Sequence, residues 1–146
     1  MDPWAEHIRV ARLSDARELA GLSGQLGYPS TEAKVRERLR LLDDPERTLL
    51  VAVSPGGLAG FIDVHVQRTV EEDAYGEVGG LVVAAGRRGS GAGAALLEAA
   101  AAWVRERGLA HMWIRANLAR GPAAHGFYDR VGCTTVKDQR VYEYPL

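Results

Sequence analysis

Apolar and polar positions alternate in some stretches of the chain and follow helical spacing in others. Alternation predicts a strand, and apolar residues three or four positions apart predict an amphipathic helix. The expected strands span residues 7–13, 48–53, 58–67, 77–83 and 112–116, with one or two more between 134 and 144. The expected helices span residues 14–26 and 31–42, a long stretch that begins in the glycines at 86–93 and ends near 107, and residues 123–131. The order, β-α-α-β-β-β-α-β-α-β, is typical of a mixed α/β domain with one strand–helix–strand crossover.

Capping residues support the ends of these helices. Ser14 or Asp15 is expected to cap the first helix, and Ser30 or Thr31 the second, because such side chains accept hydrogen bonds from first-turn N–H groups. Gly108 is the expected C-terminal cap of the long helix.

The composition is that of a globular protein. The 146 residues are 47% hydrophobic and 25% charged, which predicts one domain over residues 1–146 and excludes disorder. No stretch approaches the ~18–20 apolar residues of a membrane span, and the first residues lack the features of a signal peptide, so we expect a cytoplasmic protein. The single cysteine, Cys133, permits no internal disulfide and no cysteine zinc site, and is interpreted as a small apolar residue.

Charge is balanced in sum but not along the chain. The net charge of −1 argues against nucleic acid or an acidic membrane as the main partner. Residues 1–86 contain 9 Lys and Arg against 14 Asp and Glu, whereas residues 87–140 contain 9 against 4. The C-terminal half is therefore expected to attract a small anion, and the N-terminal half a cation.

Glycine is concentrated at one place, where 6 of the 17 glycines lie between Gly79 and Gly93. The strand at 77–83 leads through these glycines into the long helix. Such a turn favours anion binding, because first-turn N–H groups have no carbonyl partners and the helix dipole adds positive charge. Glycine lets the backbone approach a phosphate closely, and Arg87 and Arg88 add two guanidinium groups.

Two common phosphate-binding motifs do not fit this turn. Gly86 and Gly91 have the spacing of a nucleotide P-loop, but the Lys and Ser/Thr that should follow are Ala92 and Gly93. The stretch Gly89-x-Gly91-x-x-Ala94 matches the permissive dinucleotide pattern, but no Asp or Glu ends the next strand to hold the ribose.

A third pattern fits in two separate blocks. Arg88-Gly89-Ser90-Gly91-Ala92-Gly93 follows Gln/Arg-x-x-Gly-x-Gly/Ala after a strand ending in Leu81-Val82-Val83, and Asn117 with Ala124…Phe127-Tyr128…Gly132 forms the second block. On these blocks and the strand order, nearly the whole chain resembles the GNAT superfamily of acyl-CoA-dependent N-acyltransferases. The resemblance implies an α/β fold with a mixed, mostly antiparallel sheet of about six or seven strands and helices on both faces. The chain departs from the family pattern at Ala85 and Cys133, and residues 14–45 match no specific motif of the family.

The resemblance also implies a reaction: direct transfer of the acetyl group from acetyl-CoA to a primary amine of a small molecule or peptide, in a ternary complex and without a metal. Backbone groups of Leu81–Val83 are expected to bind the pantetheine arm, with the Val83 N–H polarising the acetyl carbonyl. The residues expected to bind the coenzyme are Leu81, Val82, Val83, Arg88, Gly89, Ser90, Gly91, Ala92, Gly93, Asn117 and Phe127.

Two residues are assigned to proton transfer. Tyr128 is the candidate acid for the departing thiolate, with packing beside Phe127 as the alternative role. Glu77 is the candidate base, acting directly or through water, with a surface carboxylate as the alternative. The residues expected to line the acceptor pocket are Tyr28, Asp63 and His65; the last two share a face of the 58–67 strand.

A second function is compatible with the same blocks. A non-catalytic domain that binds or senses acyl-CoA would carry the same coenzyme loop, because fold does not fix function. The presence of Tyr128 and a candidate base favours the enzyme. The pattern leaves the acceptor amine open, and the resemblance allows a homodimer.

Overall fold

The structure, a computed structural model, describes residues 3–146. The chain divides into two compact units, one ending at Arg115 and the other comprising Ala116–Leu146. The first unit contains a five-stranded sheet and three α-helices, and the second contains one α-helix.

The sheet of the first unit is mixed and mostly antiparallel, as predicted. Its strands are β1 (Ile8–Val10), β2 (Arg47–Ser54), β3 (Gly57–Gln67), β4 (Tyr75–Val83) and β5 (Met112–Ile114). They lie in the order β1-β2-β3-β4-β5, with three antiparallel pairs and one parallel pair between β4 and β5. The expected six or seven strands are not confirmed, since the described residues form five.

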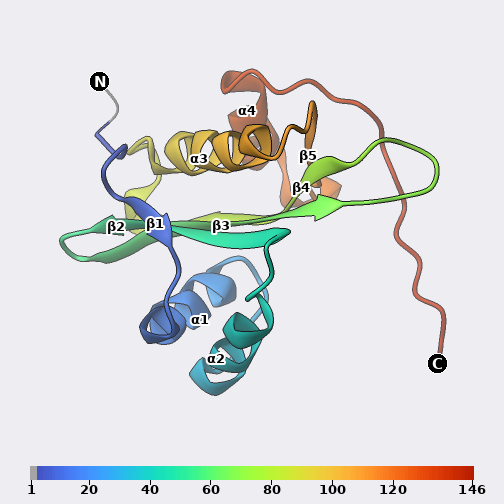
Figure 1. Ribbon diagram of the computed structural model, residues 1–146. Helices are drawn as coiled ribbons and strands as arrows, with labels where there is room; N and C mark the ends of the chain where they lie inside the picture. Colours follow the sequence, from blue (N-terminus) through green and yellow to red (C-terminus); the bar gives the residue numbers. More distant parts are fainter. Residues whose placement is uncertain (1–2) are drawn as a thin grey trace. The chain divides into compact units, whose positions relative to one another are not determined.

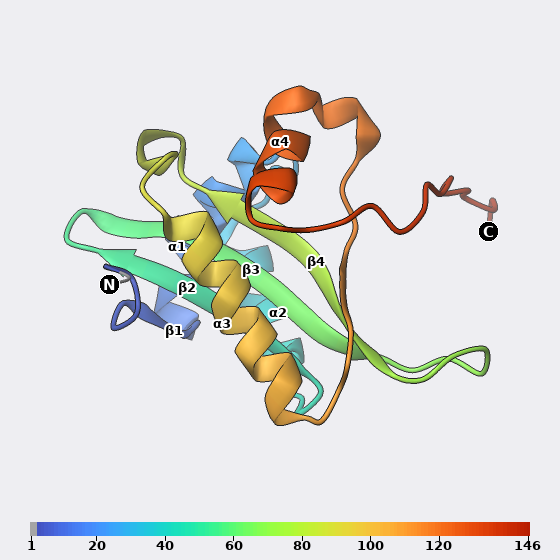
Figure 2. The same ribbon diagram turned by 90° about the horizontal axis from the view of Figure 1, so that it is seen from above.

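Helices cover both faces of this sheet (Figure 1). The helices α1 (Ala16–Gln25) and α2 (Glu32–Leu41) lie on one face, and α3 (Ala92–Glu106) lies on the other. Figure 2 shows α3 over the central strands, where it connects β4 to the parallel β5. Thr31 caps α2 as predicted, because its side chain accepts a hydrogen bond from the Lys34 N–H at 3.2 Å.

The cap expected at the first helix is wrong. A short 3-10 turn, η1 (Leu13–Asp15), precedes α1, and no side chain caps α1 itself. The Asp15 carboxylate instead accepts hydrogen bonds from the Arg9 guanidinium at 2.8 and 2.9 Å, and from the Arg12 N–H at 2.7 Å. The bonds from Arg9 hold the pKa of Asp15 below its usual value, although burial opposes them. Asp15 therefore fastens β1 to the start of α1.

Apolar residues fill both sides of the sheet. On the α1–α2 side, Leu19 and Leu22 belong to a cluster with Val51. On α3 the buried residues include Leu96, Leu97, Ala100 and Val104, as the helical spacing predicts. Trp103 of the same helix is only half-buried. Its ring instead lies under the Arg107 guanidinium, 3.6 Å from the ring centre.

One glycine allows α3 to approach the sheet closely. A Cβ built on Gly76 of β4 would lie 2.4 Å from Cγ2 of Val104, well inside van der Waals contact. The absence of a side chain at position 76 therefore fixes how near the helix lies to the strand.

The second unit contains the 3-10 turn η3 (Leu118–Arg120) and α4 (Pro122–Arg130). The strands expected between 134 and 144 are absent from the structure as described. Val136 and Tyr142 in this segment are 63% and 83% exposed. A strand requires a neighbour to complete its hydrogen-bond ladder, and residues 116–146 contain no other strand.

We predict that Gly76→Ala lowers the free energy of unfolding by about 1–3 kcal/mol, because the added methyl group overpacks against Val104. Gly21→Ala is the matched control, since Gly21 lies in α1 with nothing within 4 Å of its Cβ position. We expect that change to stabilise the protein by about 0.5–1 kcal/mol. Urea unfolding of both variants measures the difference, and equal effects would contradict the close approach.

Candidate active site

The glycine-rich turn joins the end of β4 to the start of α3. After the short turn η2 (Ala85–Arg87), Gly89 and Gly91 have φ values of +79° and +88°, in the left-handed region that favours glycine. Gly91 precedes the first residue of α3 and has no side chain to cap the helix, while the Ser90 hydroxyl accepts a long hydrogen bond, 3.4 Å, from the Ala92 N–H. The start of this 15-residue helix therefore offers the Gly93 and Ala94 N–H groups to an anion.

Two side chains from distant parts of the sequence hold this turn. The indole N–H of Trp4 donates to the Ser90 carbonyl at 3.0 Å, and its ring lies 3.8 Å from the Cβ position of Gly91. The Gln25 side-chain oxygen accepts from the Ala85 N–H at 3.0 Å. Sequence analysis missed both contacts, because they join residues 86 and 60 positions apart and leave no local pattern.

The coenzyme-loop residues differ in their exposure. Arg88 is exposed, whereas Arg87 is half-buried and its Nη2 lies 3.0 Å from the Cβ position of Gly56 in the β2–β3 turn. Ser90 is exposed, and Ala92 and Gly93 are buried at the start of α3. Of the two arginines, Arg88 extends into solvent beside the turn.

A β-bulge divides β4 into two parts. Asp63 of β3 pairs with Gly80 while Val64 pairs with Val78, so Gly79 is an extra residue in β4. The parallel strand β5 pairs only with Gly76–Val78, before the bulge. Residues 80–83, which include the predicted pantetheine-binding positions, pair with β3 alone among the described strands. One edge of this part of β4 is therefore left without a ladder partner.

Glu77, the predicted base, is engaged on both of its oxygens. It is 9% exposed; Oε1 accepts a short hydrogen bond from the Arg115 Nε, and Oε2 lies 3.4 Å from Nε2 of His65. The hydrogen bond to Glu77 is the main cause that raises the pKa of Arg115. Sequence analysis did not identify Arg115, which lies just after β5 and is 38 residues from Glu77. The structure places Glu77 in an ion pair rather than facing solvent.

Asp63 has the opposite environment on the same face of the sheet. Its Oδ1 is buried and has no hydrogen-bond partner among residues 3–146. Burial raises the pKa of Asp63, despite the opposing charges of Arg47 and His65. Its Oδ2 lies 3.3 Å from the Cβ position of Gly79, so the carboxylate adjoins the bulge.

The three predicted acceptor residues come from two elements of the first unit. Asp63 and His65 share one face of β3, as their spacing predicts. Tyr28 lies on the loop between α1 and α2 and is 64% exposed. The Tyr28 backbone is fastened to α1, since its carbonyl accepts from the Ser23 hydroxyl at 2.6 Å.

The remaining predicted residues lie in the second unit. Phe127 and Tyr128 of α4 are half-buried, and their rings pack edge-to-face at 5.3 Å. The Asn117 side-chain oxygen accepts from the Ala119 N–H at 2.9 Å, which begins the turn η3. Burial raises the pKa of the Cys133 thiol and the Asp129 charge adds to this, which does not favour a reactive thiolate.

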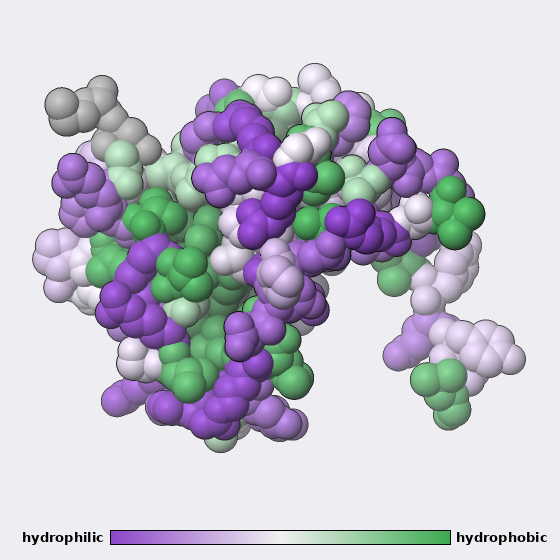
Figure 3. Space-filling view, in the orientation of Figure 1, coloured by the Kyte–Doolittle hydropathy of each residue, from purple (hydrophilic) through white to green (hydrophobic). Residues whose placement is uncertain are grey.

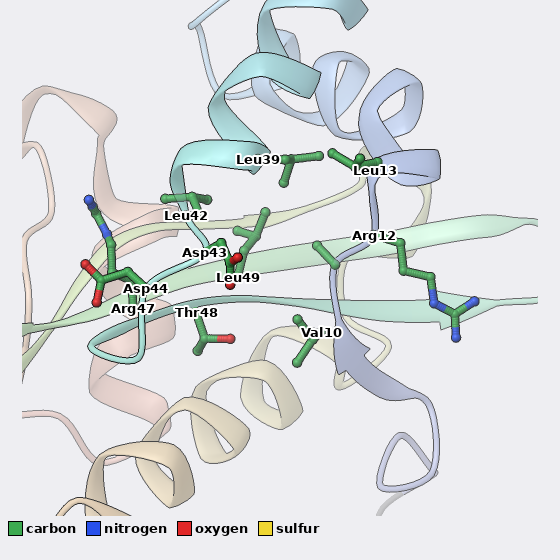
Figure 4. Close-up of a pocket in the computed structure, with 11 residues that line it drawn as sticks. Val10, Arg12, Leu13, Leu39, Leu42, Asp43, Asp44, Arg47, Thr48 and Leu49 are labelled. Carbon is green, nitrogen blue, oxygen red and sulfur yellow. The ribbon is translucent and has the colours of Figure 1, made fainter.

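A separate cavity of about 290 Å³ opens at the edge of the first unit. It lies between β1, the end of α2 and the start of β2, where Asp43 and Asp44 lie near Arg47 and the Arg12 side chain points away (Figure 4). Hydrophobic side chains are visible among hydrophilic ones over the same region in Figure 3. None of the predicted site residues lines this cavity.

Residues 3–146 contain no group of three or more His, Cys, Asp or Glu side chains suited to a metal ion. No helix within the same residues is long and apolar enough to cross a membrane.

Comparison with known proteins adds a family match to this geometry. The model of the acetyltransferase (GNAT) family matches residues 13–133. The chain is also similar to streptothricin acetyltransferase of Streptomyces lavendulae, with 37% identity over 94 residues, which cover 62% of this chain and 46% of that protein. The chain thus matches about half the length of this curated relative.

Solved structures share the fold at low sequence identity. An aminoglycoside 6′-N-acetyltransferase from Acinetobacter haemolyticus has a TM-score of 0.81 and 19% identity, covering 95% of this chain and 98% of that one. Glucosamine-6-phosphate N-acetyltransferase from Arabidopsis thaliana has a TM-score of 0.80 and 18% identity, covering 94% and 97%.

We predict that Trp4→Phe lowers the free energy of unfolding by about 1 kcal/mol, because the Ser90 carbonyl loses its donor while the aromatic ring remains. Trp103→Phe is the control, since the Trp103 ring stacks on Arg107 at the other end of α3. Chemical denaturation of the two variants compares the losses. A loss for Trp103→Phe as large as that for Trp4→Phe would contradict a specific role of the indole N–H.

Proposed function

Because the chain belongs to the acetyltransferase (GNAT) family, we propose that it transfers the acetyl group of acetyl-CoA to a primary amine by direct attack in a ternary complex. The observation that carries the proposal is the glycine-rich turn, in which Gly89 and Gly91 bring a strand into the start of α3. The open edge of β4 leads into the same turn.

The turn suits a pyrophosphate. Positive φ values at Gly89 and Gly91 expose backbone N–H groups, and the start of α3 adds the positive end of its dipole. The exposed Arg88 supplies a guanidinium for a phosphate oxygen. We assign coenzyme binding to the whole loop from Arg88 to Gly93, with Phe127 added by resemblance.

The open edge of β4 suits the pantetheine arm. Leu81, Val82 and Val83 pair with β3 on one side only, so an extended amide chain can complete the ladder on the other. We assign the polarisation of the acetyl carbonyl to the Val83 N–H. For Asn117 we propose a pantetheine contact through its amide nitrogen, since its oxygen already caps η3.

Acetyl transfer to an amine poses two proton problems near pH 7. An alkyl amine titrates near pH ~10 and must lose a proton, whereas a thiol titrates near ~8.5 and must regain one. We assign protonation of the departing thiolate to Tyr128. We assign removal of the amine proton to a carboxylate on the face of the sheet formed by β3 and β4. That this carboxylate is Glu77 stays a prediction.

The acceptor is proposed to be a cationic amine. The relatives act on streptothricin and on the 6′-amino group of aminoglycosides, as their names state. The acidic balance of residues 1–86, with 14 acidic against 9 basic side chains, favours a positively charged substrate. A non-catalytic acyl-CoA-binding domain is not favoured, because the curated relative is an enzyme.

The test is release of free thiol from acetyl-CoA in the presence of single amines. The panel contains streptothricin, an aminoglycoside with a 6′-amino group, a polyamine and, as an anionic comparison, glucosamine 6-phosphate. We expect release with at least one cationic amine and N-acetylation of that amine by mass spectrometry. Stabilisation by acetyl-CoA without thiol release from any amine would favour the non-catalytic domain.

We predict that acetyl-CoA raises the Tm of the protein. At a concentration 100 times its Kd, the ligand is expected to add about 2.7 kcal/mol to the free energy of unfolding. Gly91→Asp is expected to abolish this shift, because it places a side chain and a negative charge where the pyrophosphate is assigned. Gly108→Asp is the control, since Gly108 also has a positive φ, +74°, but follows α3. A folded Gly91→Asp variant with the full shift would exclude the assigned loop.

We predict that Tyr128→Phe lowers kcat roughly 10²-fold while acetyl-CoA still raises the Tm equally, because only the proton donor is lost. Tyr142→Phe removes a hydroxyl from an 83% exposed ring and is expected to change neither quantity. Thiol release at several pH values measures the effect. Unchanged release in Tyr128→Phe would assign the hydroxyl a structural role.

A further inference from the structure

Resting on the acetyl transfer proposed above, we propose that Asp63, rather than Glu77, binds the ammonium group of the acceptor amine and takes its proton. The two carboxylates lie on one face of adjacent strands and differ in what surrounds them. Glu77 is held by two cationic or polar partners, whereas Asp63 has a buried oxygen that no described residue satisfies.

Glu77 is poorly placed to receive a cation. Its Oε1 accepts from Arg115 and its Oε2 faces His65 at 3.4 Å, so an incoming ammonium group must displace one of them. The Arg115 guanidinium, which is hydrogen-bonded to Glu77, also repels a positively charged substrate that approaches this carboxylate. Protonation of Glu77 would break its ion pair with Arg115, which leaves Arg115 without its charged partner. Glu77 is therefore a positioning residue, which holds Arg115 and His65.

Asp63 has the features that Glu77 lacks. Its Oδ1 is buried without a hydrogen-bond partner in the part of the chain that the structure describes, and leaving a charged oxygen in this state reduces stability. An ammonium group would supply both the missing donor and the opposite charge. The residue as a whole stays partly exposed, and the neighbouring position, Gly79, is an exposed glycine with no side chain to block approach.

Asp63 lies beside the bulge, at the start of the open segment of β4. It pairs with Gly80, immediately before Leu81–Val83, the segment assigned to the pantetheine arm, whereas Val83, whose N–H is assigned to the acetyl carbonyl, pairs with Gly60 on the same strand as Asp63. Glu77 pairs with His65 on the other side of the bulge, within the part of β4 that β5 covers. The carboxylate nearer to the open edge is thus Asp63.

Of the carboxylates on the face of the sheet that carries Asp63, His65 and Glu77, Asp63 is the one without a hydrogen-bonded cationic partner among the described residues. The titratable or charged side chains on the elements packed around it are Arg47 on β2, His65 on β3, Tyr75 and Glu77 on β4, Arg115 after β5, and Arg17 and Glu18 on α1. Glu18 accepts from the Leu58 N–H at 2.6 Å, at the other end of β3. Burial outweighs Arg47 and His65 and raises the pKa of Asp63, which brings a carboxylate base closer to neutral working pH.

The proton and electron balance is simple. The amine binds as an ammonium ion and passes one proton to Asp63, which frees the lone pair on nitrogen. The nitrogen–carbon bond forms at the acetyl carbonyl carbon while the carbon–sulfur bond of the thioester breaks. The sulfur leaves with the bonding pair and takes a proton from Tyr128 or water. A second proton leaves the nitrogen as the amide forms and restores the hydroxyl of Tyr128 or the water molecule, and Asp63 then releases its own proton to solvent.

The first test uses stability alone. Because folding raises the pKa of Asp63, its ionisation opposes folding above that pKa, so Asp63→Asn should raise the Tm at pH 7 and not at pH 3.5. Asp15→Asn is the matched control of opposite sign. Folding lowers the pKa of Asp15, so its contribution is present at pH 7 and is lost as the pH falls through the folded pKa. A fall in Tm for Asp63→Asn at pH 7 like that for Asp15→Asn would overturn the inference, because the carboxylate would then stabilise the fold.

The second test uses activity with the amine of the panel that gives the fastest thiol release. We expect Asp63→Asn to lower kcat/KM at pH 7 by about 10²–10⁴-fold, with the acetyl-CoA-induced rise in Tm unchanged. Only amine already deprotonated in solution can react with this variant. Between pH 7 and the pKa of the amine, kcat/KM of the variant should therefore rise about tenfold per pH unit, whereas we expect kcat/KM of the wild type to be independent of pH in this range.

The outcomes separate this inference from the proposed function. If the wild-type protein acetylates no amine, the proposed function fails first. If the wild type is active and Asp63→Asn keeps both its rate and its pH profile, the base is another group and this inference alone is wrong. In Glu77→Gln we expect a lower Tm, because Arg115 loses its charged partner, and a pH profile shaped like that of the wild type.

Discussion

The register shift at Gly79 is the constraint on which the rest of the candidate site depends. The pairing of β4 with β5 stops at Val78, one residue before the extra residue, so one segment of the strand is covered by β5 and the next segment has an open edge. The covered segment contains Gly76, against which α3 packs, and Glu77 with its ion pair. The open segment leads directly into the glycine-rich turn at the start of the same helix. Packing and binding are thus assigned to successive segments of one strand.

Local patterns predicted the elements well, because each depends on neighbours in sequence. Periodicity identified all five observed strands and four helices, and glycine spacing identified the turn at 86–93. The unpredicted features are contacts across large separations. Arg115 reaches Glu77 across 38 residues and Trp4 reaches Ser90 across 86. Asp15 illustrates the same point, since a side chain typical of a helix cap pairs with Arg9 instead. The alternation after residue 133 predicted one or two strands that the structure does not contain as described, because a strand needs a partner strand as well as an alternating sequence.

Environment, rather than residue type, separates the acidic groups of this fold. Asp15 is fastened by an arginine and a backbone N–H, and Glu77 by an arginine and a histidine, whereas nothing among residues 3–146 reaches the buried oxygen of Asp63. The first two stabilise what surrounds them, whereas the third opposes folding when it is ionised. A protein that retains such a group near its binding surface accepts lower stability where a ligand would supply the missing contact. The sequence alone shows three similar acids.

The contact between Trp4 and the glycine-rich turn makes this region optically distinct. Indole fluorescence depends on the charges and dipoles near the ring, and Trp4 lies against Ser90 and Gly91, where an anion is assigned. The other two tryptophans have different neighbours, since Trp103 stacks under Arg107 and Trp113 packs on Tyr75. If an anion binds as assigned, we expect one component of the intrinsic emission to follow occupancy of the turn, and no external dye is needed to observe it.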